Sequence, residues 1–394
     1  MNKCCFWKIS ENMKRTLILR SIMVLVISCM LIVPATCKAE QNLEAQIEKS
    51  LILPDWGNGD YHDYYDTIVL LNEFNEKYPQ FVSIFPIGES VNGKDIFCVR
   101  ITNENNNSDK FSGLMDGCIH GHEWESCEGL LYFIEYLLIN SQRNESILDI
   151  MNTTELYIVP IVNPDGRQKD QRWNENGVDL NRNFDIFFGK LRGHCIPLGK
   201  IFGQIKIPII KLPFIDIYNG WYYNCGRYPF SEPETKALKD LMSSLDKKNF
   251  SFYLNVHTPT HNLLTPWLSY KAPFKVTEQE QGLFNHVLDW LEANTEYEPY
   301  RGGRVKRGGL AMDWCFKEFH VPSFLIELYS MDYVSYHGTI FKYYTHDHYD
   351  LVHWMKASLP FFMYLFVNAE NLYNWDEPKN EPILPEGIPP PPLG

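Results

Sequence analysis

The chain has 394 residues, and 45% of them are hydrophobic, which is enough apolar side chain for a large packed core. Acidic residues outnumber basic ones, 49 Asp and Glu against 36 Lys and Arg, and the formal net charge at pH 7 is −13. This balance argues against nucleic acid or an anionic membrane as a partner, because both attract basic surfaces.

Residues 1–39 have the pattern of a secretory signal peptide. The basic pair Lys14-Arg15 precedes an apolar run over 21–33, and small residues follow up to Ala39. Arg20 interrupts the apolar stretch, so no stable membrane span is expected after the leader is cleaved. We therefore expect a secreted or extracytoplasmic protein, with an uncleaved signal anchor and cytoplasmic residence as the alternatives.

Cysteines that follow the leader are candidates for disulfide bonds, because exported proteins fold in oxidising compartments. Cys195 and Cys225 are the preferred pair, since they bracket an irregular segment, 185–230, with the composition of a long surface insertion. Cys118 and Cys127 lie in core-like segments and are expected to be buried thiols.

Periodicity predicts the elements after an expected linker at 40–59. A helix with apolar residues on one face begins near Asp60 and ends at Pro79. Further apolar patterns predict strands at 82–86, 95–101, 113–120, 154–162, 252–256 and 323–328, and helices at 123–140 and 278–294. Short apolar strands that alternate with helices indicate an α/β fold whose sheet is buried on both faces. The Pro-rich residues 374–394 are expected to form an extended tail.

Three possible metal ligands stand at the ends of these predicted strands. His120 and Glu123 share one strand-to-helix turn, and His257 ends another apolar run. Two imidazoles and a carboxylate match a catalytic zinc site, which keeps one coordination position open. Open α/β sheets place their sites at such strand ends. Two alternatives remain: His122 and Glu125 repeat the spacing, and His257 alone is compatible with a core histidine that donates to a backbone carbonyl.

Six ordered motifs carry a family resemblance over roughly 60–373. They are Gly117–Trp124, Asn163–Gly166, Asp179–Phe184, Ser231–Thr235, His257 and Glu327. With these motifs the chain resembles the zinc metallocarboxypeptidases of the carboxypeptidase A/B superfamily. The resemblance implies a single catalytic domain over 60–373, with a central mixed, mostly buried sheet flanked by helices.

The resemblance also implies a role for each matching residue. His120, Glu123 and His257 would bind one Zn²⁺ per chain, and Glu327 would be the general base and proton shuttle. Arg172 would stabilise the oxyanion, unless it is an exposed loop arginine. The pair that would hold the terminal carboxylate of the substrate is Asn181 and Arg182.

Two positions bear on substrate recognition. Val305 stands where most relatives have a mobile tyrosine, and Tyr300 is the nearest tyrosine. Met312 occupies a position that often sets specificity, and its uncharged side chain favours apolar or aromatic C-terminal residues.

The hypothesis is therefore a monomeric, zinc-dependent exopeptidase that acts on peptide or protein C-termini. Two alternatives use the same scaffold. One is a hydrolase of cell-wall or otherwise modified peptides, and the other is a peptide-binding protein without turnover.

Overall fold

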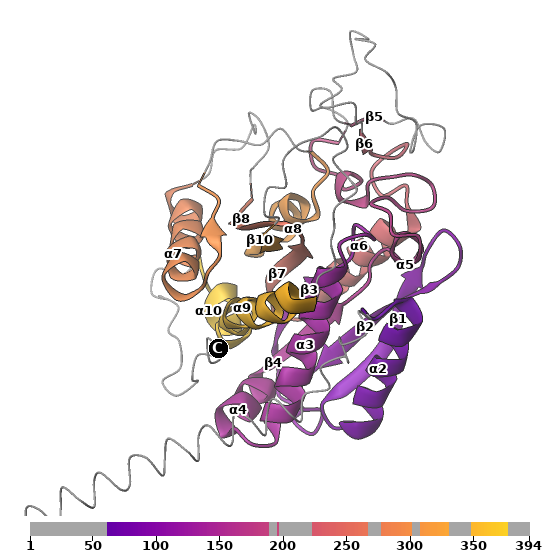
Figure 1. The fold of residues 1–394 in the computed structure, drawn as a ribbon. Helices are drawn as coiled ribbons and strands as arrows, with labels where there is room; N and C mark the ends of the chain where they lie inside the picture. The colour runs from indigo at the N-terminus through magenta and orange to yellow at the C-terminus, as the bar shows by residue number, and fades with distance from the viewer. Residues whose placement is uncertain are drawn as a thin grey trace, which may run out of the picture. The chain divides into compact units, whose positions relative to one another are not determined.

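The computed structural model describes residues 61–188, 195–196, 223–266, 277–301, 308–330 and 348–376. All of them belong to one compact unit, Leu53–Gly394. At its centre is an eight-stranded sheet in the order β1-β2-β4-β3-β7-β10-β8-β9 (Figure 1). The strands are β1 (Val82–Glu89), β2 (Asp95–Ile101), β3 (Phe111–Asp116), β4 (Thr154–Val159), β7 (Phe250–His257), β8 (Thr260–Leu264), β9 (Glu298–Pro299) and β10 (Ser323–Ser330).

The four central strands run parallel. β3 pairs in parallel with both β4 and β7, and β7 pairs in parallel with β10. Antiparallel pairs flank this centre, β1 with β2 and β2 with β4 on one side, and β10 with β8 on the other. The sheet is mixed, as predicted, and the carboxyl ends of β3, β7 and β10 meet at one edge.

Helices cover both faces of the sheet. They are α2 (Tyr64–Lys77), α3 (Trp124–Ser141), α4 (Glu145–Thr153), α5 (Pro164–Gln168), α6 (Pro233–Leu245), α7 (Glu278–Asn294), α8 (Ala311–Phe319), α9 (His348–Val367) and α10 (Ala369–Tyr373). On the face toward the viewer in Figure 1, Phe133 of α3 packs on Phe362 of α9 with ring centroids 5.5 Å apart. On the other face, Leu238 of α6 and Trp314 of α8 join a buried cluster with Tyr253 of β7. The predicted α/β class is confirmed.

The predicted helix after residue 60 is confirmed as α2. Asp63 caps it by accepting from the backbone N–H groups of Tyr65 and Asp66, and Asp66 completes a capping box. The predicted strand at 113–120 is shorter in the structure, because β3 ends at Asp116. Cys118 has a φ of 45°, a left-handed conformation that a strand cannot accommodate, so the chain turns here toward α3.

The predicted Cys195–Cys225 disulfide is wrong. β5 (Cys195–Ile196) pairs with β6 (Tyr223–Asn224), and the register places Cys195 opposite Tyr223 instead of Cys225. Cys225 is a buried free thiol. Cys118 and Cys127 are also buried free thiols, as predicted.

Several predictions fall outside the described residues. They concern the leader, the linker, Val305, most of the segment 185–230 and most of the Pro-rich tail. Within the described part of the chain, no helix combines the length and the apolar character that crossing a membrane requires.

Candidate metal centre

His120, Glu123 and His257 converge at the carboxyl edge of the central strands. One ligand atom from each residue lies within 4.8 Å of the others. Each of the three residues is only 2% exposed, so the cluster is buried. The sheet explains this convergence, because β3 leads into the turn with His120 and β7 ends at His257.

Glu123 joins the two histidines. It stands at the N-cap position of α3, but its side chain makes no capping hydrogen bond. Its carboxylate oxygens lie 2.7 Å from His120 Nδ1 and 2.7 Å from His257 Nδ1. The turn fits because Gly121 packs against the backbone of α5, where an added Cβ would lie 2.1 Å from the carbonyl carbon of Gly166.

The outer nitrogens of the two imidazoles face acceptors. His120 Nε2 lies 3.0 Å from Asp179 Oδ1, and His257 Nε2 lies 2.6 Å from Asn255 Oδ1. A carboxylate ion and an amide oxygen can only accept, so each Nε2 carries a hydrogen. Asn181 Nδ2 lies 3.0 Å from His257 Nε2 as well, but the shorter contact with Asn255 Oδ1 requires a hydrogen between its two atoms. A neutral imidazole with hydrogen on Nε2 presents a lone pair at Nδ1.

This arrangement fits a metal ion. With both imidazoles neutral, two Nδ1 lone pairs and a carboxylate point at one another, and a cation between them would stabilise this set of acceptors. Two nitrogens and one carboxylate suit zinc, and backing groups such as Asp179 are what ligand histidines usually have.

Charges around the cluster favour the anionic form of its carboxylates. Burial by itself would raise the pKa of Glu123, but His120 and His257, when they are protonated, hold it well below its ordinary value. Burial is likewise outweighed at Asp179, where Arg172, Arg182 and His120 keep the pKa of the carboxyl group well below its usual range.

The alternative pair, His122 and Glu125, does not join the cluster. Glu125 is buried, and its Oε1 accepts from Tyr61 Oη at 3.4 Å. Burial lowers the pKa of His122 to about 3, so this imidazole is neutral at pH 7. Of the two equally spaced pairs, the structure therefore places His120 and Glu123, and not His122 and Glu125, in the cluster.

Glu327 lies beside the cluster on the neighbouring strand. Its backbone pairs in register with His257 across the parallel strands β7 and β10. Residues that pair in register point to the same face of a sheet, so the half-buried Glu327 lies on the face that carries His257.

Arg172 reaches the same centre from the loop after α5. Its Nε donates to Asp179 Oδ2 at 2.9 Å, and its Nη1 donates to Glu123 Oε1 at 3.4 Å. The side chain is only 14% exposed, so the structure places it in the site instead of on an exposed loop.

Asn181 and Arg182 lie in a short 3₁₀ turn, η2 (Leu180–Arg182), and both are buried. Asn181 Nδ2 donates to Asn255 Oδ1 at 3.1 Å, and Asn181 Oδ1 accepts from the backbone N–H of Ala311 at 2.8 Å. The amide of Asn181 therefore faces the outer side of His257. Arg182 Nη1 donates to the backbone oxygen of Asn181 at 2.5 Å.

Met312 lies in the first turn of α8 and is fully buried in the cluster that contains Leu238 and Tyr253. Tyr300 is partly buried against the same cluster. How these two residues act on a substrate stays a prediction.

Sequence reasoning missed Asp116, Asn255 and Tyr253. Asp116 accepts hydrogen bonds from the hydroxyl of Tyr253 and, at 2.7 Å, from Nδ2 of Asn255. All three residues are fully buried. The available signal was a polar residue within an apolar strand, since Asn255 interrupts the run from Phe252 to Val256.

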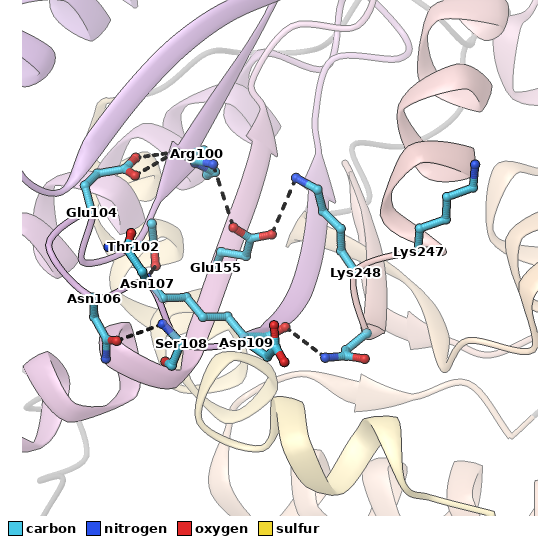
Figure 2. Close-up of a pocket in the computed structure, with 12 residues that line it drawn as sticks. Arg100, Thr102, Glu104, Asn106, Asn107, Ser108, Asp109, Glu155, Lys247 and Lys248 are labelled. Carbon is cyan, nitrogen blue, oxygen red and sulfur yellow. Dashed lines mark hydrogen bonds and ion pairs between the residues drawn. The ribbon is translucent and has the colours of Figure 1, made fainter.

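A polar cavity of about 510 Å³ lies at the opposite edge of the sheet (Figure 2). It is next to the starts of β3, β4 and β7, and all of its lining residues are polar or charged. Two of its cations contact acidic neighbours: Arg100 lies 2.6 Å from Glu104 and 3.9 Å from Glu155, and Lys248 lies 3.8 Å from Glu155. The cavity is separate from the metal centre, because the two lie at opposite ends of the central strands.

Comparisons with known proteins agree with this geometry. The family model described as zinc carboxypeptidase matches residues 67–204 and 218–347. Mast cell carboxypeptidase A of Mus musculus is 26% identical over 73% of this chain and 68% of its own length. Carboxypeptidase O of Bos taurus is 25% identical over 55% of this chain and 55% of its own length, so the match spans little more than half of that relative.

The fold also matches a solved structure. The crystal structure of carboxypeptidase A from Helicoverpa armigera superposes with a TM-score of 0.59 and 18% sequence identity. The match covers 87% of this chain and 82% of that one.

Proposed function

The chain belongs to the zinc carboxypeptidase family, and we propose that it is a secreted, zinc-dependent exopeptidase that hydrolyses the C-terminal peptide bond of peptides. The observation that carries this proposal is the buried cluster of His120, Glu123 and His257, with Glu327 in register beside His257. These three cluster residues would hold one Zn²⁺. Bound zinc would act as a Lewis acid toward the scissile carbonyl and would make water more acidic.

Glu327 is proposed as the general base. It accepts a proton from the attacking water and passes it to the nitrogen of the departing residue. Its position supports this role, because a carboxylate between Ile326 and Leu328 on a central strand is expensive to bury unless a cation lies nearby.

Arg172 is proposed to stabilise the negative charge that develops on the carbonyl oxygen. Its guanidinium is held by Asp179 and Glu123, so it does not have to reorganise when the charge forms. Fixed donors in a water-excluding site are worth more than the same donors in water.

Arg182 is proposed to bind the terminal carboxylate of the substrate, assisted by Asn181. A guanidinium that pairs with the terminal carboxylate would make cleavage specific for chain ends. In this structure the Asn181 amide bonds to Asn255 and Ala311, so its contact with substrate requires a rearrangement.

An apolar or aromatic C-terminal residue is the proposed preference. The uncharged side chain of Met312 supports this preference. It is fully buried in an apolar cluster, and it offers no charge that would select a charged C-terminal residue. The substrate would be a peptide or a protein C-terminus, and the enzyme is proposed to act as a monomer.

The experiment is a library of blocked peptides that differ in the C-terminal residue, cleaved by the wild type and by Glu327→Gln. The variant should keep its zinc and lose at least about a hundredfold in kcat, because general base catalysis contributes about 10²–10⁴. Glu318→Gln, at an exposed position of α8, is the matched control and should retain wild-type activity.

Two results would contradict the proposal. If no peptide in the library shows chelator-sensitive release of an amino acid, the chain is a binding protein or acts on another substrate class, such as murein peptides, which can be supplied in parallel. If Glu327→Gln retains full activity, Glu327 is not the base.

A further inference from the structure

Three residues share one face of β7, and two of them, Tyr253 and Asn255, hydrogen-bond to the same neighbour on β3. Side chains alternate along a strand, so Tyr253, Asn255 and His257 share a face. On β3, Asp116 pairs in register with Asn255 and lies on that face as well. Asp116, Tyr253 and Asn255 are fully buried, so their hydrogen bonds are not exchanged with water.

The carboxylate of Asp116 dictates which way the amide of Asn255 points. One Asp116 oxygen accepts from the hydroxyl of Tyr253, and the other accepts from Nδ2 of Asn255 at 2.7 Å. A carboxylate ion has no hydrogen to donate, so it accepts only the NH₂ side of the amide. The oxygen side of Asn255 must then face away from Asp116.

That amide oxygen meets the outer nitrogen of His257. Asn181 Nδ2 lies 3.0 Å from that nitrogen as well, but Asn255 Oδ1 is closer to it, at 2.6 Å. Two acceptors at 2.6 Å would repel without a hydrogen between them, so Nε2 keeps its hydrogen and Asn255 Oδ1 accepts from both Nε2 and Asn181 Nδ2, the latter at 3.1 Å. It therefore selects the imidazole tautomer with hydrogen on Nε2. Nδ1 is left with its lone pair toward Glu123, where the metal would be.

The opposite amide orientation would have nearly the same shape but the opposite effect. A flipped Asn255 would present its NH₂ group to Nε2 and select the tautomer with hydrogen on Nδ1, which cannot bind a metal. The other histidine needs no such intermediary, because Asp179 accepts directly from His120 Nε2 at 3.0 Å.

We propose that Asp116 is a positioning residue of the metal centre, which fixes the metal-binding tautomer of His257 through the amide of Asn255. This inference rests on the proposed zinc-dependent function. It adds that one ligand histidine is held by a carboxylate directly and the other by a carboxylate acting through an amide.

The test compares zinc affinity, measured by competition with a chelator, in the full-length wild type and three variants. Burial raises the pKa of Asp116 to about 7, so measurements at about pH 8 keep the carboxylate ionised. Asp116→Asn can both donate and accept, and it no longer dictates the amide orientation. We expect its zinc affinity to fall by about 10–100-fold, the usual effect of losing a group behind a metal ligand.

Two further variants separate this role from packing. Tyr253→Phe removes the other hydrogen bond of Asp116 and leaves the Asn255 contact, so its zinc affinity should stay within about threefold of the wild type. The double variant Asp116→Asn/Asn255→Asp exchanges the two groups. It keeps the charge and the number of side-chain atoms, and it places an acceptor-only carboxylate directly on His257 Nε2. It should restore zinc affinity to within about threefold of the wild type.

Each outcome of these measurements either supports or overturns the inference. The inference is overturned if folded Asp116→Asn binds zinc like the wild type, or if Tyr253→Phe is weakened as much as Asp116→Asn. It is also overturned if the exchanged double variant stays as weak as Asp116→Asn. If Asp116→Asn does not fold, the double variant decides alone, with near-normal affinity supporting the inference and weak affinity refuting it. A wild type that binds no zinc would refute the proposed function itself.

Discussion

Replacing Gly121 by alanine should damage the metal centre through one misplaced methyl group. A Cβ at this position would lie 2.1 Å from the carbonyl carbon of Gly166 and 2.2 Å from the backbone nitrogen of Arg167. Carbon atoms in ordinary contact are about 3.5 Å apart or more, so the turn or α5 would have to move by more than about 1 Å. His120 precedes Gly121 and Glu123 follows it by two residues in the same turn, so this displacement would reach two proposed ligands.

The expected cost has two parts. Overpacking of this kind lowers the free energy of unfolding by about 1–3 kcal/mol, measured by urea denaturation of the metal-free protein. A displacement of about 1 Å in a catalytic group lowers kcat/KM by about a hundredfold, measured with the best substrate of the peptide library.

Gly282→Ala is the matched control for this substitution. Gly282 lies in α7, where an added Cβ meets no atom within 4 Å. Alanine should therefore stabilise the protein by about 0.5–1 kcal/mol through its helix propensity, with unchanged activity. A Gly121→Ala protein with wild-type stability and activity would refute the steric reasoning.

Two other predictions concern the surroundings of the site. Asn174→Ala should lower kcat by about tenfold with unchanged zinc affinity. The buried Asn174 donates to Glu232 at 2.8 Å and to Glu234 at 3.0 Å, and these bonds anchor the loop that carries Arg172. Equal kcat values for the variant and the wild type would contradict this prediction. The second prediction is that His62→Gln removes part of the pH dependence of the free energy of unfolding. Burial alone would lower the pKa of His62, but its partner Glu128 outweighs burial, and the pKa lies above its ordinary value. The ion pair therefore stabilises the fold fully below about pH 6.5 and loses this effect as pH rises through the raised pKa. Denaturation between about pH 5.5 and about pH 9 should show that the free energy of unfolding of the wild type loses its excess over that of the variant. An excess that stays constant with pH would exclude the ion pair as its source.

Apolar patterning was sufficient to predict six of the eight strands of the sheet and the place of the candidate metal centre, but it did not predict the short strands β8 and β9. Parallel strands end at a common edge, so residues that follow two apolar runs, such as His120 and His257, can be expected to meet. The choice between two equally spaced pairs required the structure, because the turn after β3 determines that Glu123 points to the cluster while Glu125 points to Tyr61.

Register and polar contacts inside the sheet were not predictable in the same way. The Cys195–Cys225 bridge failed because cysteine spacing contains no information on which residues of two strands stand opposite each other. Asn255 was overlooked because its strand was predicted from the apolar residues around it, and a single amide side chain changes that apolar pattern little. Its importance depends on Asp116, a residue that is distant in sequence and adjacent only through strand pairing.

The pairing of Glu327 with His257 separates the chemistry from the choice of substrate. Adjacent strands are about 4.8 Å apart in any sheet, so backbone hydrogen bonding alone maintains the spacing between the proposed base and a proposed ligand. Loops at the rim can therefore change in length or composition, and so shift which chain ends are accepted, without altering the reactive pair. Removing one residue from either strand would instead turn a side chain to the far face and abolish turnover at once.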